Sequence, residues 1–250
     1  MTSSTLAADF GGSATAGLKS TTAAKPDRRM FHSRLIGALF LLGFVFYGTG
    51  FGLVSSVTGA PGFMSTIASH QMTLAIGAIL MLLPIITDVW RAVVFFPILG
   101  EHGRSTALTY LAAQIVSVSM FFVGVVSLLL IVPLGQLAAD AAGSDVAWAA
   151  AMGTLMVQSN EIAYQIAQLS LVFGSLSLWF YGLRVGLIPR AFAAFALVGY
   201  VVHLTGVVAE LLGFHIGSML LIPGALFEVA LPFWLFFKGF NASAYGKAAE

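Results

Sequence analysis

Six apolar runs divide the sequence, and each is long enough to cross a lipid bilayer. They lie at residues 35–57, 72–98, 106–133, 161–183, 189–211 and 216–237. A helix rises about 1.5 Å per residue, so a run of about 20 residues covers the roughly 30 Å of hydrocarbon in a membrane. Membrane β-strands are shorter and alternate strictly between apolar and polar positions, a pattern that these runs lack. The sequence therefore predicts an all-α integral membrane bundle of about six transmembrane helices.

The basic residues predict the orientation of this bundle. The loops at 58–71, 134–160 and 212–215 contain no Lys or Arg. All eleven basic residues lie in the alternate connections, near them, or in the terminal segments: Lys19, Lys25, Arg28, Arg29, Arg34, Arg91, Arg104, Arg184, Arg190, Lys238 and Lys247. Cytoplasmic loops carry the excess of Lys and Arg in membrane proteins. We therefore predict that the N and C termini are both cytoplasmic.

One further apolar segment, residues 145–160, does not fit as a seventh crossing. It is too short to span a bilayer alone, and a crossing there would reverse the charge bias of every later loop. We expect either an interfacial helix or an outward extension of the fourth transmembrane helix.

The terminal segments predict the domain organisation. Residues 1–33 are rich in Ser, Thr, Ala and Gly, which bury too little apolar surface to fold, so we expect a disordered cytoplasmic tail. Residues 34–240 form the predicted transmembrane domain, and residues 241–250 a short cytoplasmic C-terminal tail. Within the first helix, Gly48 and Gly52 are spaced for close contact with another helix, although ordinary glycine usage also explains them.

The composition limits the classes of function. Of 250 residues, 59% are hydrophobic and only 8% are charged, whereas soluble domains carry about 25% charged residues. The partner that this surface fits is the lipid bilayer. A net charge of +1 offers no basic field for nucleic acid, and the absence of cysteine excludes disulfides, thiolate metal sites and cysteine catalysis. A homo-oligomer or another membrane protein as partner stays open.

Glu228 is the leading functional candidate because it lies about twelve residues into the sixth run, near the middle of the bilayer. The short connection between the fifth and sixth runs makes them antiparallel neighbours. Matching depths places Tyr200 level with Glu228 and His203 about one turn further out. A carboxyl group at that depth would hold a proton or share one with these side chains, or simply link two helices through hydrogen bonds.

Asp88 and Arg91 are the other ionisable pair inside a run. They are three residues apart on one helix face, so they can form an ion pair. One interpretation gives them a place in a substrate or proton pathway. In the other, Arg91 extends to the cytoplasmic headgroups and Asp88 neutralises it.

Uncharged polar residues accompany these groups. Glu161, Gln165 and Gln168 form one stripe on the fourth helix, and Gln114 and Ser117 lie in the third. They could line a wet cavity, and interhelical hydrogen bonds would also explain them.

Histidines allow only a weak metal hypothesis. His70 and His215 both start helices on the predicted outer side, where Glu161 lies at a similar level, so the three could hold a divalent cation. A membrane haem needs paired histidines at one depth, and only His203 lies inside a run. We therefore expect no cofactor.

Short motifs resemble a bacterial family of multi-pass membrane proteins. They are Gly186-Leu-Ile-Pro189-Arg190 at the start of the fifth run, Glu228, Lys238-Gly239, and Asp88-Val-Trp-Arg in the second run. This pattern resembles the family called domain of unknown function 4386, over residues 30–240. The resemblance implies a membrane bundle in the bacterial cytoplasmic membrane and no particular activity.

These observations favour a non-enzymatic protein, either a small carrier or an accessory or sensor subunit. No nucleotide-binding or hydrolase motif occurs in the sequence. The alternative is a membrane-embedded enzyme that acts on a lipid or uses the outer metal site. A polar cavity that reaches Glu228 would favour the carrier, and a cluster of His70, His215 and Glu161 would favour the enzyme.

Overall fold

The computed structural model describes residues 27–100, 102–139 and 144–245, and these ranges are helical, without strands. Most residues belong to long helices, which confirms the predicted all-α membrane bundle. The elements are α1 (Arg28–Thr58), the 3-10 helix η1 (Phe63–Thr66), α2 (Ile67–Leu99), α3 (Arg104–Leu129), α4 (Ile131–Ala139), α5 (Ser144–Val185), α6 (Arg190–Leu211), α7 (Gly217–Leu220) and α8 (Ile222–Phe237).

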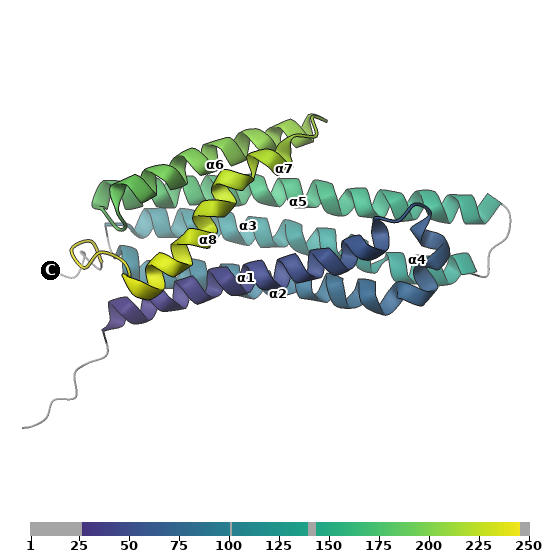
Figure 1. The fold of residues 1–250 in the computed structure, drawn as a ribbon, viewed down its shortest axis with the longest axis horizontal. Coiled ribbons are helices and arrows are strands. Elements are labelled where there is room, and N and C mark those ends of the chain that lie inside the picture. The colour runs from purple at the N-terminus through teal and green to yellow at the C-terminus, as the bar shows by residue number, and fades with distance from the viewer. Residues whose placement is uncertain (1–26, 101, 140–143, 246–250) are drawn as a thin grey trace, which may run out of the picture.

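Six of these helices pack side by side in a closed ring. Helix α1 contacts α2, α2 contacts α3, and α3 contacts α5, while α5, α6, α8 and again α1 complete the circle. Figure 1 shows the helices along the long axis of the molecule, with α8 inclined across α1. The centre of the ring is therefore bordered by all six helices.

Among the described residues, five segments are long and apolar enough to cross a membrane, and α7 with the shorter apolar helix α8 occupies the sixth predicted run. The predicted run at 216–237 is interrupted because Pro223 has no N–H to continue the helical hydrogen bonds. Leu221 still has helical backbone angles, so α7 leads directly into α8. Large apolar side chains such as Met72, Phe173 and Phe237 lie on the outer surface. Lipid solvates such a surface, and the protein is a multi-pass membrane protein.

The two ends of the bundle differ. We call one end the basic end. Both ends of the described chain lie there, and so do all described Lys and Arg residues other than the buried Arg91. They are Arg28, Arg29, Arg34, Arg104, Arg184, Arg190 and Lys238. At the far end, α2 and α5 extend past the turn between α6 and α7 (Figure 1). Helix α5 has 42 residues and α6 has 22, so at 1.5 Å per residue α5 is longer by about 30 Å. The segment 145–160 is therefore an extension of the fourth predicted helix.

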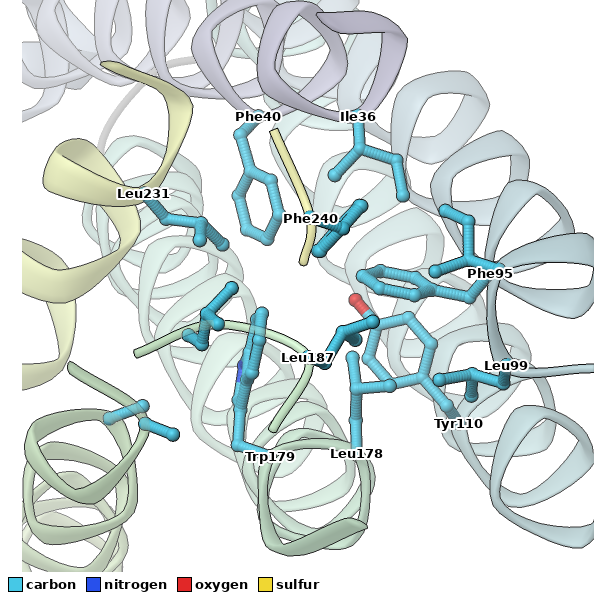
Figure 2. Close-up of a cluster of buried hydrophobic side chains, with 14 of the residues drawn as sticks. Ile36, Phe40, Phe95, Leu99, Tyr110, Leu178, Trp179, Leu187, Leu231 and Phe240 are labelled. Carbon is cyan, nitrogen blue, oxygen red and sulfur yellow. The ribbon is translucent and has the colours of Figure 1, made fainter. Parts of the chain in front are cut away.

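Two hydrophobic cores lie at these ends. The basic-end core is rich in aromatic rings, and Figure 2 shows Phe240 among Phe40, Phe95 and Leu187. The far-end core joins α1, α2, α3, η1, α4 and the start of α5. Its buried members are mostly aliphatic: Val54, Val57, Phe63, Met64, Ile67, Leu74, Ala78, Met81, Val125, Leu128, Ile131, Leu134 and Ala149.

The C-terminal segment is packed rather than free at its start. Phe240 is fully buried, and its backbone N–H donates to Ser33 Oγ at 3.0 Å. Asn241 donates from Nδ2 to the carbonyl of Gly186 at 2.5 Å. The predicted tail at 241–250 is thus tied to the bundle through residue 245, and residues 246–250 lie outside the described part. Residues 1–26 of the predicted N-terminal tail also lie outside the described part. Helix α1 begins at Arg28, before the predicted start of the transmembrane domain at residue 34.

A close contact between helices occurs in α1, at a different glycine from those predicted. Gly48 and Gly52 have open space around them. Gly50 instead faces Gly77 of α2, and a Cβ added at Gly50 would stand 2.6 Å from the Gly77 carbonyl oxygen. The absence of a side chain at Gly50 lets the two backbones approach there.

Candidate functional site

A cavity of about 130 Å³, lined by apolar side chains and by a set of polar ones, lies at the centre of the ring, between the two cores. All six ring helices contribute to its lining. The residues are Phe40, Gly43, Phe44 and Tyr47 of α1, Pro84, Asp88 and Arg91 of α2, Phe121 of α3, Tyr164, Gln168 and Leu171 of α5, His203 of α6, Ala225 and Glu228 of α8, and Leu221. A volume of this size holds several water molecules or one small organic molecule.

Arg91 contacts three side chains of the bundle. Its Nη2 lies 3.1 Å from Asp88 Oδ1, and its Nε donates to the Tyr110 hydroxyl at 3.0 Å. The guanidinium carbon also lies 4.0 Å above the centre of the Phe40 ring. The predicted pair of Asp88 and Arg91 is formed. Arg91 is buried and points into the bundle, so it does not extend to the headgroups.

Glu228 faces α6, as its depth in the sequence suggested. Its Oε1 accepts a hydrogen bond of 2.5 Å from the Tyr200 hydroxyl. His203, one turn further along α6, lines the same cavity. Its Nε2 is buried and has no hydrogen-bond partner among the described residues. The structure therefore brings Glu228, Tyr200 and His203 together, with a direct hydrogen bond between the first two.

The polar stripe on α5 reaches the cavity only in part. Gln168 lines it, and the side-chain oxygen of Gln168 has no partner in the described part of the chain. Glu161, about two turns further toward the far end, is exposed on the outer surface. Gln114 and Ser117 on α3 are fully buried, and their polar side-chain atoms are also without partners in the described ranges. The bundle interior is thus polar over several turns.

The structure does not gather the predicted metal ligands. His70 Nδ1 lies 3.0 Å from the Thr66 carbonyl at the start of α2, while His215 Nδ1 lies 3.5 Å from Glu210 Oε2. Within the described ranges, no three His, Asp or Glu side chains group as metal ligands would. Helix lengths explain this, because α2 has 33 residues and α6 has 22. His70 lies three residues inside α2, so at 1.5 Å per residue it is about 10 Å beyond the level at which α6 ends, next to the turn that contains His215.

An aromatic cluster that the sequence did not predict closes the far side of the cavity. The rings of Tyr47, Phe121 and Tyr164 form a triangle with centroid distances of 5.7 Å on each side. They come from α1, α3 and α5, and α1 and α5 are not neighbours in the ring. A tyrosine in the middle of an apolar run was the available signal, but its partner depends on contacts across the ring.

Comparison with known proteins identifies a family and no activity. No curated protein and no solved structure matches the chain. The family model described as domain of unknown function (DUF4386) matches residues 35–239, which include Asp88, Arg91 and Glu228. This match covers most of the chain and agrees with the resemblance inferred from its short motifs. The chain therefore belongs to the domain of unknown function 4386 family.

Proposed function

We propose that this membrane protein is a small carrier that binds its ligand in the central cavity, with Glu228, Tyr200 and His203 as a protonatable centre. The observation that carries the proposal is the cavity itself. It is lined by six helices, and the polar side chains of Asp88, Arg91 and Glu228 converge on it. If these side chains only held the helices together, we would expect them to be fully hydrogen-bonded, without a cavity beside them and without unpartnered polar atoms nearby.

The position of the cavity suits a carrier. The basic-end core separates it from one end of the bundle, and the far-end core separates it from the other. Substrate sites of secondary transporters lie near the middle of the membrane, with access that alternates between the two sides. A ligand held between the two cores would be separated from both ends of the bundle, as at the central site of such a carrier.

Proton coupling would use Glu228. Among the described residues, Glu228 has no basic side chain within ion-pair distance, whereas Asp88 has Arg91. A carboxyl group in a membrane interior is costly when charged and unpaired. Protonation and deprotonation of Glu228 would therefore change the relative free energies of the protein with and without its ligand, and this difference would couple ligand binding to the proton.

We further propose that the basic end faces the cytoplasm of a bacterial cell. The support is the position of the described Lys and Arg residues at helix ends on that side. Reporter fusions in the loops at residues 102 and 186 should report the cytoplasm, and fusions at 65 and 214 the outside. One reproducibly reversed site would contradict this orientation.

An accessory or sensor role is the second candidate. The far-end extension favours it, because α2, α4 and the start of α5 project beyond the turn between α6 and α7. Such a projection offers a surface outside the bilayer to another protein. In that role the cavity would bind a ligand without moving it across the membrane.

Transport by purified protein tests the carrier proposal. We would reconstitute the full chain in liposomes that contain a pH-sensitive dye and add small cationic, neutral and anionic solutes outside. A carrier coupled to protons should change the internal pH with one class of solute. The variant Glu228→Gln should abolish that change, and Glu161→Gln, on the outer surface, should retain it. Absence of any solute-dependent change with folded protein would contradict the proposal.

A further inference from the structure

We infer that the central cavity binds a small lipophilic amine in its protonated, cationic form. This inference rests on the proposed function, because it names the class of ligand for the same cavity. Four features of the cavity support it: its charge, its hydrogen-bonding atoms, its aromatic walls and its route of access.

The charges around the cavity leave one carboxyl group for a ligand. Arg91 is engaged by Asp88 at 3.1 Å, by the Tyr110 hydroxyl at 3.0 Å and by the Phe40 ring. The Asp88 carboxylate balances the charge of Arg91, so the carboxyl group of Glu228 is the remaining charge-bearing group of the lining. Glu228 is bound only by the Tyr200 hydroxyl among the described residues, and its side chain lines the cavity. An ammonium group would supply the cation that Glu228 lacks.

The uncommitted polar atoms of the lining accept hydrogen bonds. His203 and Gln168 line the cavity, and their buried Nε2 and Oε1 atoms have no hydrogen-bond partner within the described part of the chain. An amide oxygen is an acceptor, and a neutral imidazole accepts through one of its two ring nitrogens. Together with the Glu228 carboxylate, they give an ammonium group acceptors within the cavity lining.

Aromatic rings form the remaining walls. Phe44, Tyr47, Phe121 and Tyr164 line the cavity, and three of them form the triangle described above. The face of an aromatic ring attracts cations within about 6 Å, and this attraction increases when water is excluded. The same rings provide apolar contact for a hydrocarbon group attached to the ammonium.

Access and size favour a lipophilic ligand. Phe44, Leu221 and Ala225 line the cavity on the α1 and α7–α8 side and are only partly buried, so the cavity reaches the lipid-facing surface there. Helices α1 and α8 meet near Gly37 and Pro232, toward the basic end. The cavity volume is about 130 Å³, and a cavity of about 150 Å³ accommodates benzene. A one-ring amine that partitions into the bilayer suits this route of access, and because it is larger than benzene, part of it would extend into the opening toward lipid.

Three probes of one shape separate charge from size. Benzylamine is cationic at neutral pH, benzyl alcohol is neutral and benzoate is anionic. We would titrate each into the purified full chain in detergent micelles by calorimetry, with empty micelles as the blank. We expect benzylamine to bind at least about tenfold more tightly than benzyl alcohol and benzoate not to bind. Equal binding of benzylamine and benzyl alcohol, tighter binding of benzoate, or no binding of any probe would overturn the inference.

Variants test whether the ligand binds where we infer. Glu228→Gln keeps the shape of the side chain and should weaken benzylamine binding by at least about tenfold while benzyl alcohol binding stays unchanged. Tyr164→Leu removes one aromatic wall and should weaken benzylamine binding more than Tyr164→Phe does. The control Glu161→Gln removes an exposed carboxylate and should have no effect. Benzylamine binding that Glu228→Gln leaves intact in a folded protein would overturn the inference.

The binding and transport experiments can fail separately. If another class of solute is transported and Glu228→Gln abolishes that transport, while benzylamine does not bind, the carrier proposal stands and the ligand class is wrong. If benzylamine binds through Glu228 and no solute crosses the liposome membrane, the ligand class stands and a sensor role replaces the carrier.

Discussion

The two ends of the bundle are closed by different means. At the basic end, hydrogen bonds join segments far apart in the sequence, such as the 2.5 Å bond from Arg29 Nη1 to the Phe240 carbonyl. The core above them contains interlocking aromatic rings and lies next to the buried Arg91. At the far end the core is mostly aliphatic, and hydroxyls such as those of Ser56 and Thr58 bond within their own helix. Directional contacts fix a geometry and aliphatic packing tolerates small shifts, so the far end is the more adaptable closure of the cavity.

Removing one partner of the buried ion pair should have the largest effect. Asp88→Leu leaves the Arg91 guanidinium buried beside the basic-end core without its carboxylate, and we expect a loss of about 3–5 kcal/mol in the free energy of unfolding. The measurement is unfolding of the protein in mixed micelles. The control is the double variant Asp88→Leu/Arg91→Leu, which should be less destabilised than Asp88→Leu alone. Simple additivity of the two substitutions would show that the pair is not coupled.

Truncation of matched core residues should separate the two ends directly. Phe240→Ala at the basic end should lower the free energy of unfolding by about 3 kcal/mol, because it removes a buried ring that contacts Phe95. Met81→Ala in the far-end core should cost about 2 kcal/mol, because the aliphatic neighbours can collapse around the gap. Thermal unfolding of both variants provides the comparison. A larger loss for Met81→Ala would reverse our ranking of the two closures.

The glycine contact tests the backbone approach at the far end. A Cβ at Gly50 would stand 2.6 Å from the Gly77 carbonyl oxygen and 2.8 Å from the Met81 backbone nitrogen, so α1 and α2 would have to separate. We expect Gly50→Ala to lower the melting temperature, equivalent to about 1–3 kcal/mol. Gly48→Ala is the matched control, because open space surrounds Gly48 and alanine favours the helix. Equal melting temperatures for the two variants would contradict the close approach.

The depth of a residue in the membrane and the contacts between consecutive helices could be predicted from the sequence. Contacts between helices on opposite sides of the ring could not. The short connection between α6 and α8 made them neighbours, and matching depths then gave the contact of Tyr200 with Glu228. The same reasoning cannot say which face of a uniformly apolar helix turns inward. For this reason the spacing of small residues indicates Gly48 and Gly52, whereas the close contact lies at Gly50, and the aromatic triangle that includes Tyr47 is not predicted. The metal hypothesis around His70 failed because it assumed that all helices end at one level.

A carboxyl-to-amide change should separate structure from chemistry at Glu228. Glu228→Gln keeps a hydrogen-bond acceptor for the Tyr200 hydroxyl and should leave the free energy of unfolding nearly unchanged. Glu228→Leu leaves that hydroxyl buried without its partner and should cost about 1–2 kcal/mol. Thermal unfolding measures both. If Gln abolishes ligand binding while stability is kept, Glu228 has a chemical role. If Gln has no effect and only Leu destabilises, its role is structural.

The smallest effect should come from the hydrogen bond that ties the C-terminal segment to α1. The Tyr245 hydroxyl lies 2.6 Å from His32 Nδ1, and partial burial raises the pKa of Tyr245 above its usual value. A folded-state pKa above the unfolded value contributes stability that is complete below the unfolded pKa of about 10 and is lost as the pH rises through the folded pKa. The melting temperature of the wild type should therefore fall slightly more steeply above pH 10 than that of Tyr245→Phe. At pH 7 the two should differ only by the loss of one partly exposed hydrogen bond. Parallel curves through this range would show that Tyr245 titrates equally in the folded and unfolded states, and that its contact with His32 contributes nothing to closure of the basic end.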